Sequence, residues 1–354
     1  MAEMVKEAQV IKAFLRDLKV LMPSLQVNRI RTGPPSRAKR GGLGADLVIE
    51  VRAGARTWKL LCEAKSPGEP RYLAQAIATL QLLQRGMPNS YPLVVAPYIS
   101  PEGQRLCREA GVGYADLAGN AFLQFDGVLV ERTGRKAPRE ARARLRRLFS
   151  PRATRILRVF LENPKAQWTL ARLAAEAQLS LRTAYLVVNA LVDKGFVEKR
   201  RGSITLAKAG DLLDLWAENY AFAQSRSTPY YTFVRAPGEF MERLAETAGR
   251  RRVDYAFTLH SGASLVAPFV RFTDVHVYVP GDPQPLVKAL DLRPVESGGT
   301  VYVVRPYDEG VLYKAREIRG IRVVGDIQLY LDLVKYPARG KEQADVLREQ
   351  VLKF

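Results

Sequence analysis

The stretch that decides the N-terminal fold is ADLVIEVRAGARTWKLLCEAKS, from Ala45 to Ser66. Apolar and polar residues alternate on either side of Ala53-Gly54-Ala55, which predicts two strands joined by a tight turn. An antiparallel register centred on this turn places Asp46 opposite roughly residue 62. Glu63 and Lys65 lie two apart and share one face of their strand, so we expect Asp46 to lie beside them.

Two carboxylates and an ammonium at one edge of a sheet form a candidate catalytic group. A divalent metal would offset the repulsion between the two acids, and the lysine could stabilise a developing negative charge. The sequence therefore offers Asp46, Glu63 and Lys65 as candidate catalytic residues. The alternative is a surface hairpin with a solvated Glu-Lys pair.

The hairpin resembles the core of the PD-(D/E)XK nuclease superfamily, in which an acid at one strand start and an E-x-K on the next bind magnesium. The proline that names the motif is absent here, because Gly44-Ala45 precedes the aspartate. The resemblance implies Asp46 and Glu63 as metal ligands, with Mg²⁺ or Mn²⁺ as cofactor if the centre is active. It also implies an acid from the first helix, Glu7 or else Glu3, as a further metal ligand.

The same resemblance implies a glutamine near the attacking water, and Gln75 is the matching residue. For Gln75, as for the acids of the first helix, an ordinary solvated side chain is the alternative. Asp116 has two interpretations, a turn cap or a group supporting the centre.

Length and charge point to a multidomain protein with a polyanionic partner. The 354 residues suggest two or three domains, and 47% hydrophobic residues indicate a globular chain. The formal net charge of +19 comes mainly from arginine, whose planar fork suits phosphate, so nucleic acid is the first expectation.

The cysteine and histidine content argues against two classes of site. Cys62 and Cys107 are the only cysteines, and His260 and His276 the only histidines, so neither a zinc site nor a Cys-His nucleophile is expected. The sequence has no apolar run of membrane length, and its start reads as an amphipathic helix, so we expect a cytoplasmic protein.

The pattern of elements predicts an N-terminal domain over residues 1–133 with the αβββαβ order of a restriction-endonuclease-like fold. A basic loop over 29–44, either tracking phosphate or merely connecting, leads into the hairpin. The expected helices are 3–21, 72–84 and 101–110, and the later strands are 91–96, 112–117, 121–125 and 128–132.

Residues 134–149 form a strongly basic stretch that predicts a linker helix. Almost every charge in it is positive, which favours phosphate contact, with Arg142 and Arg146 as candidates.

Residues 150–224 are typical of a winged helix-turn-helix. Helices are expected over 152–162, 171–177 and 180–194, followed by a hairpin of 196–200 and 203–206. Such a fold places its third helix in the major groove of double-stranded DNA and its wing on the backbone. The candidate DNA-binding residues are Arg182, Thr183, Tyr185 and Asn189 on the helix and Lys199, Arg200 and Arg201 on the wing. Use of this module for protein contact alone is the alternative.

Residues 225–354 are expected to form a C-terminal α/β domain, entered through a linker at 225–229. We expect a helix over 237–249, a strand-like segment over 255–268, strands over 275–279 and 300–304, and a final helix beginning near 328. Ser261-Gly262 with Asp274-Val275-His276 is similar to the nucleotidyltransferase signature. Because histidine replaces the second carboxylate, we expect a degenerate, noncatalytic relative in which His276 is packed and binds no metal.

Three phrases complete a second resemblance: SGASLVAP (261–268), VVRPYDEGV (303–311) and DIQLYLDLVKYPARGKEQADVLR (326–348). Together with the winged helix they resemble the AbiEi-type antitoxin and transcriptional regulator family of type IV toxin–antitoxin systems. The resemblance implies a DNA-binding autoregulator with a nucleotidyltransferase-type toxin as partner. Three hypotheses remain at this point: a regulator that cleaves DNA, a non-enzymatic regulator, and an RNA-binding protein. The sequence leaves a homodimer open.

Overall fold

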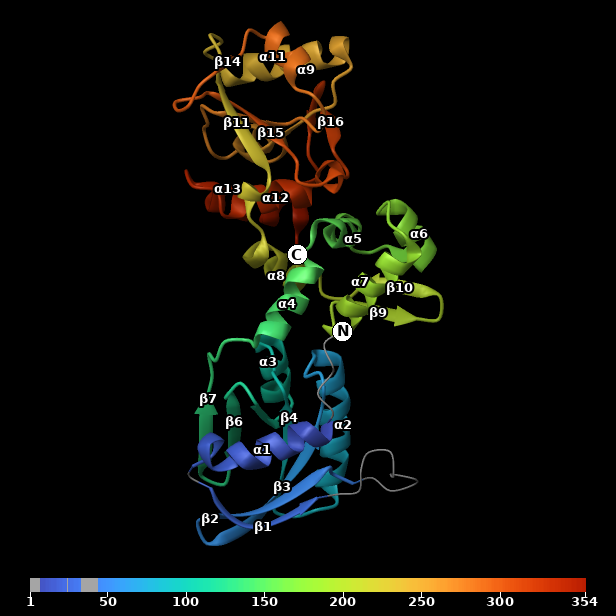
Figure 1. Ribbon diagram of the computed structural model, residues 1–354, viewed down its shortest axis with the longest axis vertical. Helices are drawn as coiled ribbons and strands as arrows, with labels where there is room; N and C mark the ends of the chain where they lie inside the picture. Colours follow the sequence, from blue (N-terminus) through green and yellow to red (C-terminus); the bar gives the residue numbers. More distant parts are fainter. Residues whose placement is uncertain (1–6, 24, 33–43) are drawn as a thin grey trace. The chain divides into compact units, whose positions relative to one another are not determined.

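The computed structural model describes residues 7–23, 25–32 and 44–354. The chain divides into two compact units, one of residues 1–145 with 191–195 and one of residues 146–190 with 196–354. Figure 1 shows the elements of both units. Among the described residues, no helix has the length and apolar character needed to cross a bilayer.

The first unit is built on a seven-stranded sheet whose strands lie in sequence order, β1 to β7. The central strands β3, β4 and β5 pair in parallel, and the flanking pairs are antiparallel. The strands are β1 Gln26–Thr32, β2 Leu47–Ala53, β3 Arg56–Ala64, β4 Ser90–Ala96, β5 Gly113–Asp116, β6 Ala121–Phe125 and β7 Val128–Arg132. The helices are α1 Glu7–Leu21, α2 Pro70–Arg85 and α3 Pro101–Glu109.

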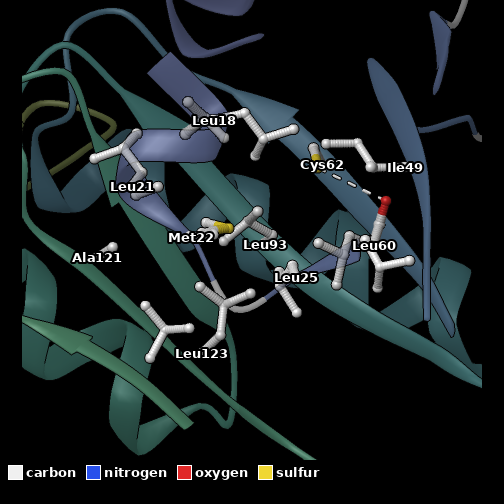
Figure 2. Close-up of a cluster of buried hydrophobic side chains, with 14 of the residues drawn as sticks. Leu18, Leu21, Met22, Leu25, Ile49, Leu60, Cys62, Leu93, Ala121 and Leu123 are labelled. Atoms are coloured by element: carbon white, nitrogen blue, oxygen red, sulfur yellow. Dashed lines mark hydrogen bonds between the residues drawn. The ribbon is translucent and has the colours of Figure 1, made fainter. Parts of the chain in front are cut away.

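Apolar side chains on both faces of this sheet are buried, as strand alternation dictates. One face packs against α1 through a cluster that includes Leu18, Ile49, Leu60 and Cys62 (Figure 2). The other face, around Leu61, packs in a separate cluster with residues of α2 and α3. Helices therefore cover both faces, and polar groups are expected at the strand ends.

The predicted hairpin is confirmed, and its turn has a physical cause. Gly54 adopts φ +58°, a left-handed conformation that glycine tolerates best. Leu47 is the register partner of Cys62, so continuing the ladder by one residue sets Asp46 opposite Glu63. The expected position, roughly residue 62, was one residue short.

The predicted basic loop over 29–44 was partly wrong. Arg29 to Thr32 belong to β1, which pairs with β2 at the edge of the sheet. Residues 33–43 of that loop, and Glu3, lie outside the described residues. Further along, α4 Arg139–Leu148 forms the predicted basic helix within residues 134–149.

In the second unit, three helices and a three-stranded sheet form the helix-turn-helix with its wing. Thr169 caps α6 through a hydrogen bond from Arg172 N to Oγ1 at 3.2 Å, and Ser180 Oγ accepts from Thr183 N at 3.2 Å. These caps fix where the second and third helices begin, and Ser180 is the cap predicted for the third helix. The elements are α5 Pro151–Glu162, β8 Gln167–Trp168, α6 Leu170–Glu176, α7 Leu181–Asp193, β9 Val197–Arg200 and β10 Ser203–Leu206.

The remainder of the second unit contains a seven-stranded sheet in the order β14-β11-β15-β13-β12-β17-β16. Its strands are β11 Arg226–Tyr231, β12 Ala256–Thr258, β13 Val275–Tyr278, β14 Arg293–Pro294, β15 Val301–Arg305, β16 Arg316–Ile318 and β17 Ile321–Val323. The helices are α8 Ala209–Asn219, η2 Phe222–Gln224, α9 Pro237–Arg251, α10 Leu259–Val266, α11 Gln284–Ala289, η3 Glu309–Leu312, α12 Asp326–Val334, α13 Gly340–Leu347 and η4 Arg348–Leu352.

Three predictions for this part were wrong. The expected linker at 225–229 lies largely in β11, a strand inside the sheet. The strand-like segment at 255–268 is the short strand β12 followed by α10. The expected final helix is divided into α12, α13 and η4, with the break between Val334 and Gly340.

Candidate functional site

The structure brings the predicted acidic residues together at one end of the hairpin. Asp46 is 6% exposed and Glu63 is 5% exposed, although both are carboxylates. Asp46 Oδ2 accepts a hydrogen bond from the backbone N of Ala64 at 3.0 Å, which ties its side chain to the neighbouring strand. Two carboxylates are thus held nearly buried on adjacent strands, a costly arrangement unless cations compensate it.

Lys65 supplies such a cation. Its Nζ lies 2.9 Å from Oε1 of Glu63 and 3.6 Å from Oε1 of Glu7 on α1. Burial alone lowers the pKa of Lys65, but the hydrogen bond to Glu63 and the charges of Glu63, Glu7 and Asp46 outweigh it and raise the pKa. The lysine is therefore a fixed positive charge among three acids.

The other two residues predicted for this centre are Glu7, which contacts it, and Gln75, which makes no such contact among the described residues. Glu7 reaches the group through Lys65, so the first helix does contribute an acid to it. Gln75 lies on the exposed side of α2, and among the described residues it forms no hydrogen bond to Asp46, Glu63 or Lys65. Its predicted role near a reacting water stays a prediction.

The donor set suits a hard divalent cation, because it consists of carboxylate oxygens with no sulfur or imidazole. Within residues 7–23, 25–32 and 44–354, no three His, Cys, Asp or Glu side chains are already gathered as a metal-binding group. The convergent carboxylates of the hairpin are two, Asp46 and Glu63, and Glu7 is joined to them by the lysine. Metal binding by these acids stays a prediction.

Asp116 is a turn cap. Its carboxylate accepts hydrogen bonds from Ile99 N at 3.0 Å, from Asn120 N at 2.9 Å and from Asn120 Nδ2 at 2.8 Å. The bonds from Asn120 hold the turn after β5, and the bond from Ile99 ties in the loop before α3, so the predicted capping role of Asp116 is confirmed. A supporting role at the acidic centre stays a prediction.

The third helix of the winged helix presents the side chains predicted to contact DNA. Arg182 and Tyr185 are exposed, and Asn189 is half-buried one turn further along the same face. Thr183 is less available, because its Oγ1 lies 2.9 Å from Ser180 Oγ in the helix cap. The helix thus displays a charged, an aromatic and an amide group at helical spacing.

The wing is basic and exposed. Lys199, Arg200 and Arg201 are all exposed, and Lys199 Nζ lies 5.2 Å from the ring centre of Tyr185. Arg200 also forms an ion pair with Glu198 at 2.8 Å. The cation–π contact between Lys199 and Tyr185 links the wing to the third helix, so the two sets of predicted residues form one surface. On α4, Arg142 and Arg146 are exposed four residues apart and therefore share a helix face.

The region that is similar to the nucleotidyltransferase signature is packed. Ser261 Oγ donates to the backbone oxygen of Thr258 at 2.7 Å, and a Cβ added at Gly262 would lie 2.9 Å from the oxygen of Phe257. His276 stacks on Tyr302 with ring centres 4.6 Å apart, and burial lowers its pKa to about 4. The expectation that His276 is packed is confirmed.

A buried polar network, which the sequence interpretation missed, joins α5 to α12. Arg158 is 1% exposed and donates to Gln328, whose Nε2 in turn donates to Asp332 Oδ1 at 2.7 Å. Asp332 also accepts from the hydroxyls of Tyr220 and Thr258. The sequence did contain one signal for this network: Arg158 interrupts the apolar pattern of an amphipathic helix, and arginine is rarely buried without partners.

Comparisons with known proteins agree with the second resemblance. Residues 205–353 match the family model described as "Transcriptional regulator, AbiEi antitoxin, Type IV TA system", and residues 151–201 match that of the IclR helix-turn-helix domain. No curated protein shows a significant match. A solved structure titled "Structure of EndoMS in apo form" aligns with 32% of this chain at 17% identity and a TM-score of 0.24, too low to define the fold. The chain spans about half, 47%, of the length of that structure. The chain thus resembles AbiEi-type antitoxin regulators over residues 205–353 and IclR-type helix-turn-helix domains over residues 151–201.

Proposed function

We propose that this protein is a transcriptional regulator that binds a specific site on double-stranded DNA through its winged helix. The observation that carries the proposal is the exposed surface formed by the third helix and the basic wing, joined by the contact between Lys199 and Tyr185. Arg182 suits a guanine edge and Asn189 an adenine edge, while the wing cations suit phosphate. The net charge of +19 would attract DNA over a longer range.

The test is DNA binding measured by fluorescence anisotropy, with duplexes drawn from the region upstream of the protein's own gene. Wild type should prefer one duplex over scrambled sequence by 10³-fold or more, with affinity that falls steeply as salt rises. Arg182→Ala should reduce this preference, and Arg243→Ala, at an exposed arginine on α9, is the matched control. A wild type that binds all duplexes equally would contradict site-specific regulation.

We also propose that the N-terminal unit cleaves DNA with Mg²⁺ or Mn²⁺. The supporting observation is the convergence of Asp46, Glu63 and Lys65 where β2 begins and β3 ends. Asp46 and Glu63 would hold the metal. Glu7, whose carboxylate pairs with Lys65, would add a third negative charge beside them. A bound divalent ion would supply Lewis-acid polarisation of the phosphodiester.

The chain's own groups have separate roles in this second proposal. The backbone N of Ala64 orients the Asp46 carboxylate, and burial keeps bulk water away from the two acids. Lys65 remains protonated and would stabilise negative charge on the phosphoryl oxygen.

The cleavage test compares supercoiled and branched DNA incubated with Mg²⁺ or Mn²⁺. Wild type should cut, whereas Glu63→Ala and Lys65→Ala should be at least 10²-fold slower, since each removes charge stabilisation. Glu131→Gln, at an acid on β7 paired with Arg108, is the control. Equal inertness of wild type and variants would leave the alternative, a non-enzymatic repressor or antitoxin whose N-terminal unit only contacts DNA or protein.

The resemblance to AbiEi antitoxins supports a further part of the proposal, a nucleotidyltransferase-type toxin as partner. Co-expression with a toxin encoded beside this gene should restore growth. Competition between duplex DNA and duplex RNA tests the remaining hypothesis, since RNA binding through the same basic surface predicts that RNA displaces the DNA.

A further inference from the structure

We propose a phosphate-binding site in the C-terminal sheet, centred on Arg226 of β11 and Arg305 of β15. The two arginines line an open cavity of about 480 Å³ at the end of the sheet, beside the loop that enters α11. Its lining shares no residue with the winged helix or with the acidic centre, and it does not depend on either function proposed above.

The register of the strands puts the two charges together. Arg226 and Arg305 are direct partners in the antiparallel ladder between β11 and β15, so their side chains leave the same face of the sheet. Both are exposed. Like charges directly opposite one another destabilise a sheet, so this pairing is unfavourable unless an anion lies between them.

The surrounding protein does not neutralise the pair. Among the described residues, neither Arg226 nor Arg305 forms an ion pair, whereas Arg316 in the same sheet pairs with Asp326 at 2.6 Å. Asp282 is the acid among the residues that line the cavity, and its Oδ1 accepts a hydrogen bond from Gln284 N at 3.0 Å, at the entry to α11. The lining therefore retains a surplus of positive charge.

The remaining walls suit a small phosphorylated ligand. Thr228 adds a hydroxyl on the same strand face as Arg226, and Val303 supplies an apolar floor. A Cβ added at Gly281 would meet nothing within 4 Å, so the opposite wall leaves room for a ligand. Paired guanidinium forks bind phosphate oxygens bidentately, and the cavity is of the size that accepts a nucleotide.

The shared chemistry is a phosphate or pyrophosphate group, which a free nucleotide or a nucleic-acid backbone could supply. We would titrate the full-length protein with inorganic pyrophosphate, ATP and a 12-nucleotide single strand, by calorimetry at low salt. Arg226→Gln and Arg305→Gln should each weaken binding by about tenfold or more, because each removes a charge-assisted fork. The Arg243→Gln control removes the same charge from α9, outside the cavity, and should stay within twofold of wild type.

Thermal unfolding provides a second readout: the substitution that weakens phosphate binding should not lower the melting temperature of the free protein. Without phosphate, Arg226→Gln should melt at the same or a higher temperature than wild type, because the like-charge contact is relieved. With pyrophosphate, wild type should gain stability and the variant should not. Binding of pyrophosphate and ATP identifies a free nucleotide as the source, and binding of the single strand alone identifies nucleic acid.

The proposal is overturned if wild type binds none of the three probes. It is also overturned if the double variant Arg226→Gln/Arg305→Gln binds them as wild type does. Duplex binding by the winged helix is measured in parallel with the Arg182→Ala variant. Loss of the anion site with retained duplex binding, or the reverse, separates the failure of this inference from failure of the regulator proposal.

Discussion

Arg158 of α5 donates from Nε to the side-chain oxygen of Gln328 on α12, 3.2 Å away, at a position that excludes water. The guanidinium also donates to Tyr307 at 2.8 Å and lies 4.9 Å from the ring centre of Trp216. The first helix of the winged helix is thus anchored to the C-terminal sheet region by a buried charge. Because the bond donors are fixed in direction, this contact sets orientation as well as stability.

Arg158→Met should lower the free energy of unfolding by about 3–5 kcal/mol, because it removes the cation that is linked to Asp332 through Gln328 and leaves that buried carboxylate uncompensated. Urea unfolding of the full chain measures this. Arg152→Met, at an exposed arginine of the same helix, is the control and should change stability by less than about 0.5 kcal/mol. A similar loss for both variants would mean that α5 is sensitive to any substitution, and the buried charge would have no special part.

The double variant Arg158→Met/Asp332→Leu should lose less unfolding free energy than the sum of the losses in the two single variants, because it contains neither buried charge. Coupling between contacting residues of this kind is typically about 0.5–3 kcal/mol. Strict additivity would show that the guanidinium and the carboxylate do not stabilise each other through Gln328.

Asp332 should also make stability depend on pH. Burial raises its pKa to about 6, against the opposing effect of hydrogen bonds from Thr258, Tyr220, Gln328 and Tyr278. Between about pH 4 and pH 6 the folded chain therefore keeps a proton that the unfolded chain releases. This contribution is complete below pH 4 and is lost as the pH rises through about 6, by about 3 kcal/mol in all.

The measurement is the difference in unfolding free energy between wild type and Asp332→Asn at pH 4.5 and at pH 7. Taking the difference cancels His276, whose lowered pKa acts in the opposite direction. The variant should gain stability relative to wild type as the pH rises. A pH-independent difference would place Asp332 at its ordinary pKa.

Local pattern was enough to predict the hairpin, because Gly54 and two apolar alternations fix its register to within one residue. It was not enough for β1, whose residues are almost all exposed and so carry no apolar alternation. Residues 259–266 were ambiguous because a short apolar run suits either a strand or a buried helix. The partnership of Arg158 with Gln328, 170 positions apart, follows from tertiary packing alone.

The acidic centre should bind Mn²⁺ if its role is catalytic, independently of any cleavage. Mn²⁺ should raise the melting temperature of wild type, and Asp46→Asn or Glu63→Gln should weaken binding by roughly tenfold or more. Electron paramagnetic resonance of free Mn²⁺ gives the affinity directly. Glu131→Gln should bind as wild type does, and equal affinity in all four proteins would remove the metal from this site.

Arg182 and Arg200 should affect DNA binding in different ways because one is placed for base edges and the other for phosphate. Arg182→Ala should cost about 1–3 kcal/mol on the preferred duplex and little on scrambled DNA. Arg200→Ala should weaken both duplexes alike and reduce the salt slope by about one. Arg200 also pairs with Glu198 at 2.8 Å, so Glu198→Gln should free its guanidinium and strengthen binding slightly. If Arg182→Ala weakened all duplexes equally, the third helix would contact only the backbone, and the source of specificity would have to lie elsewhere in the chain.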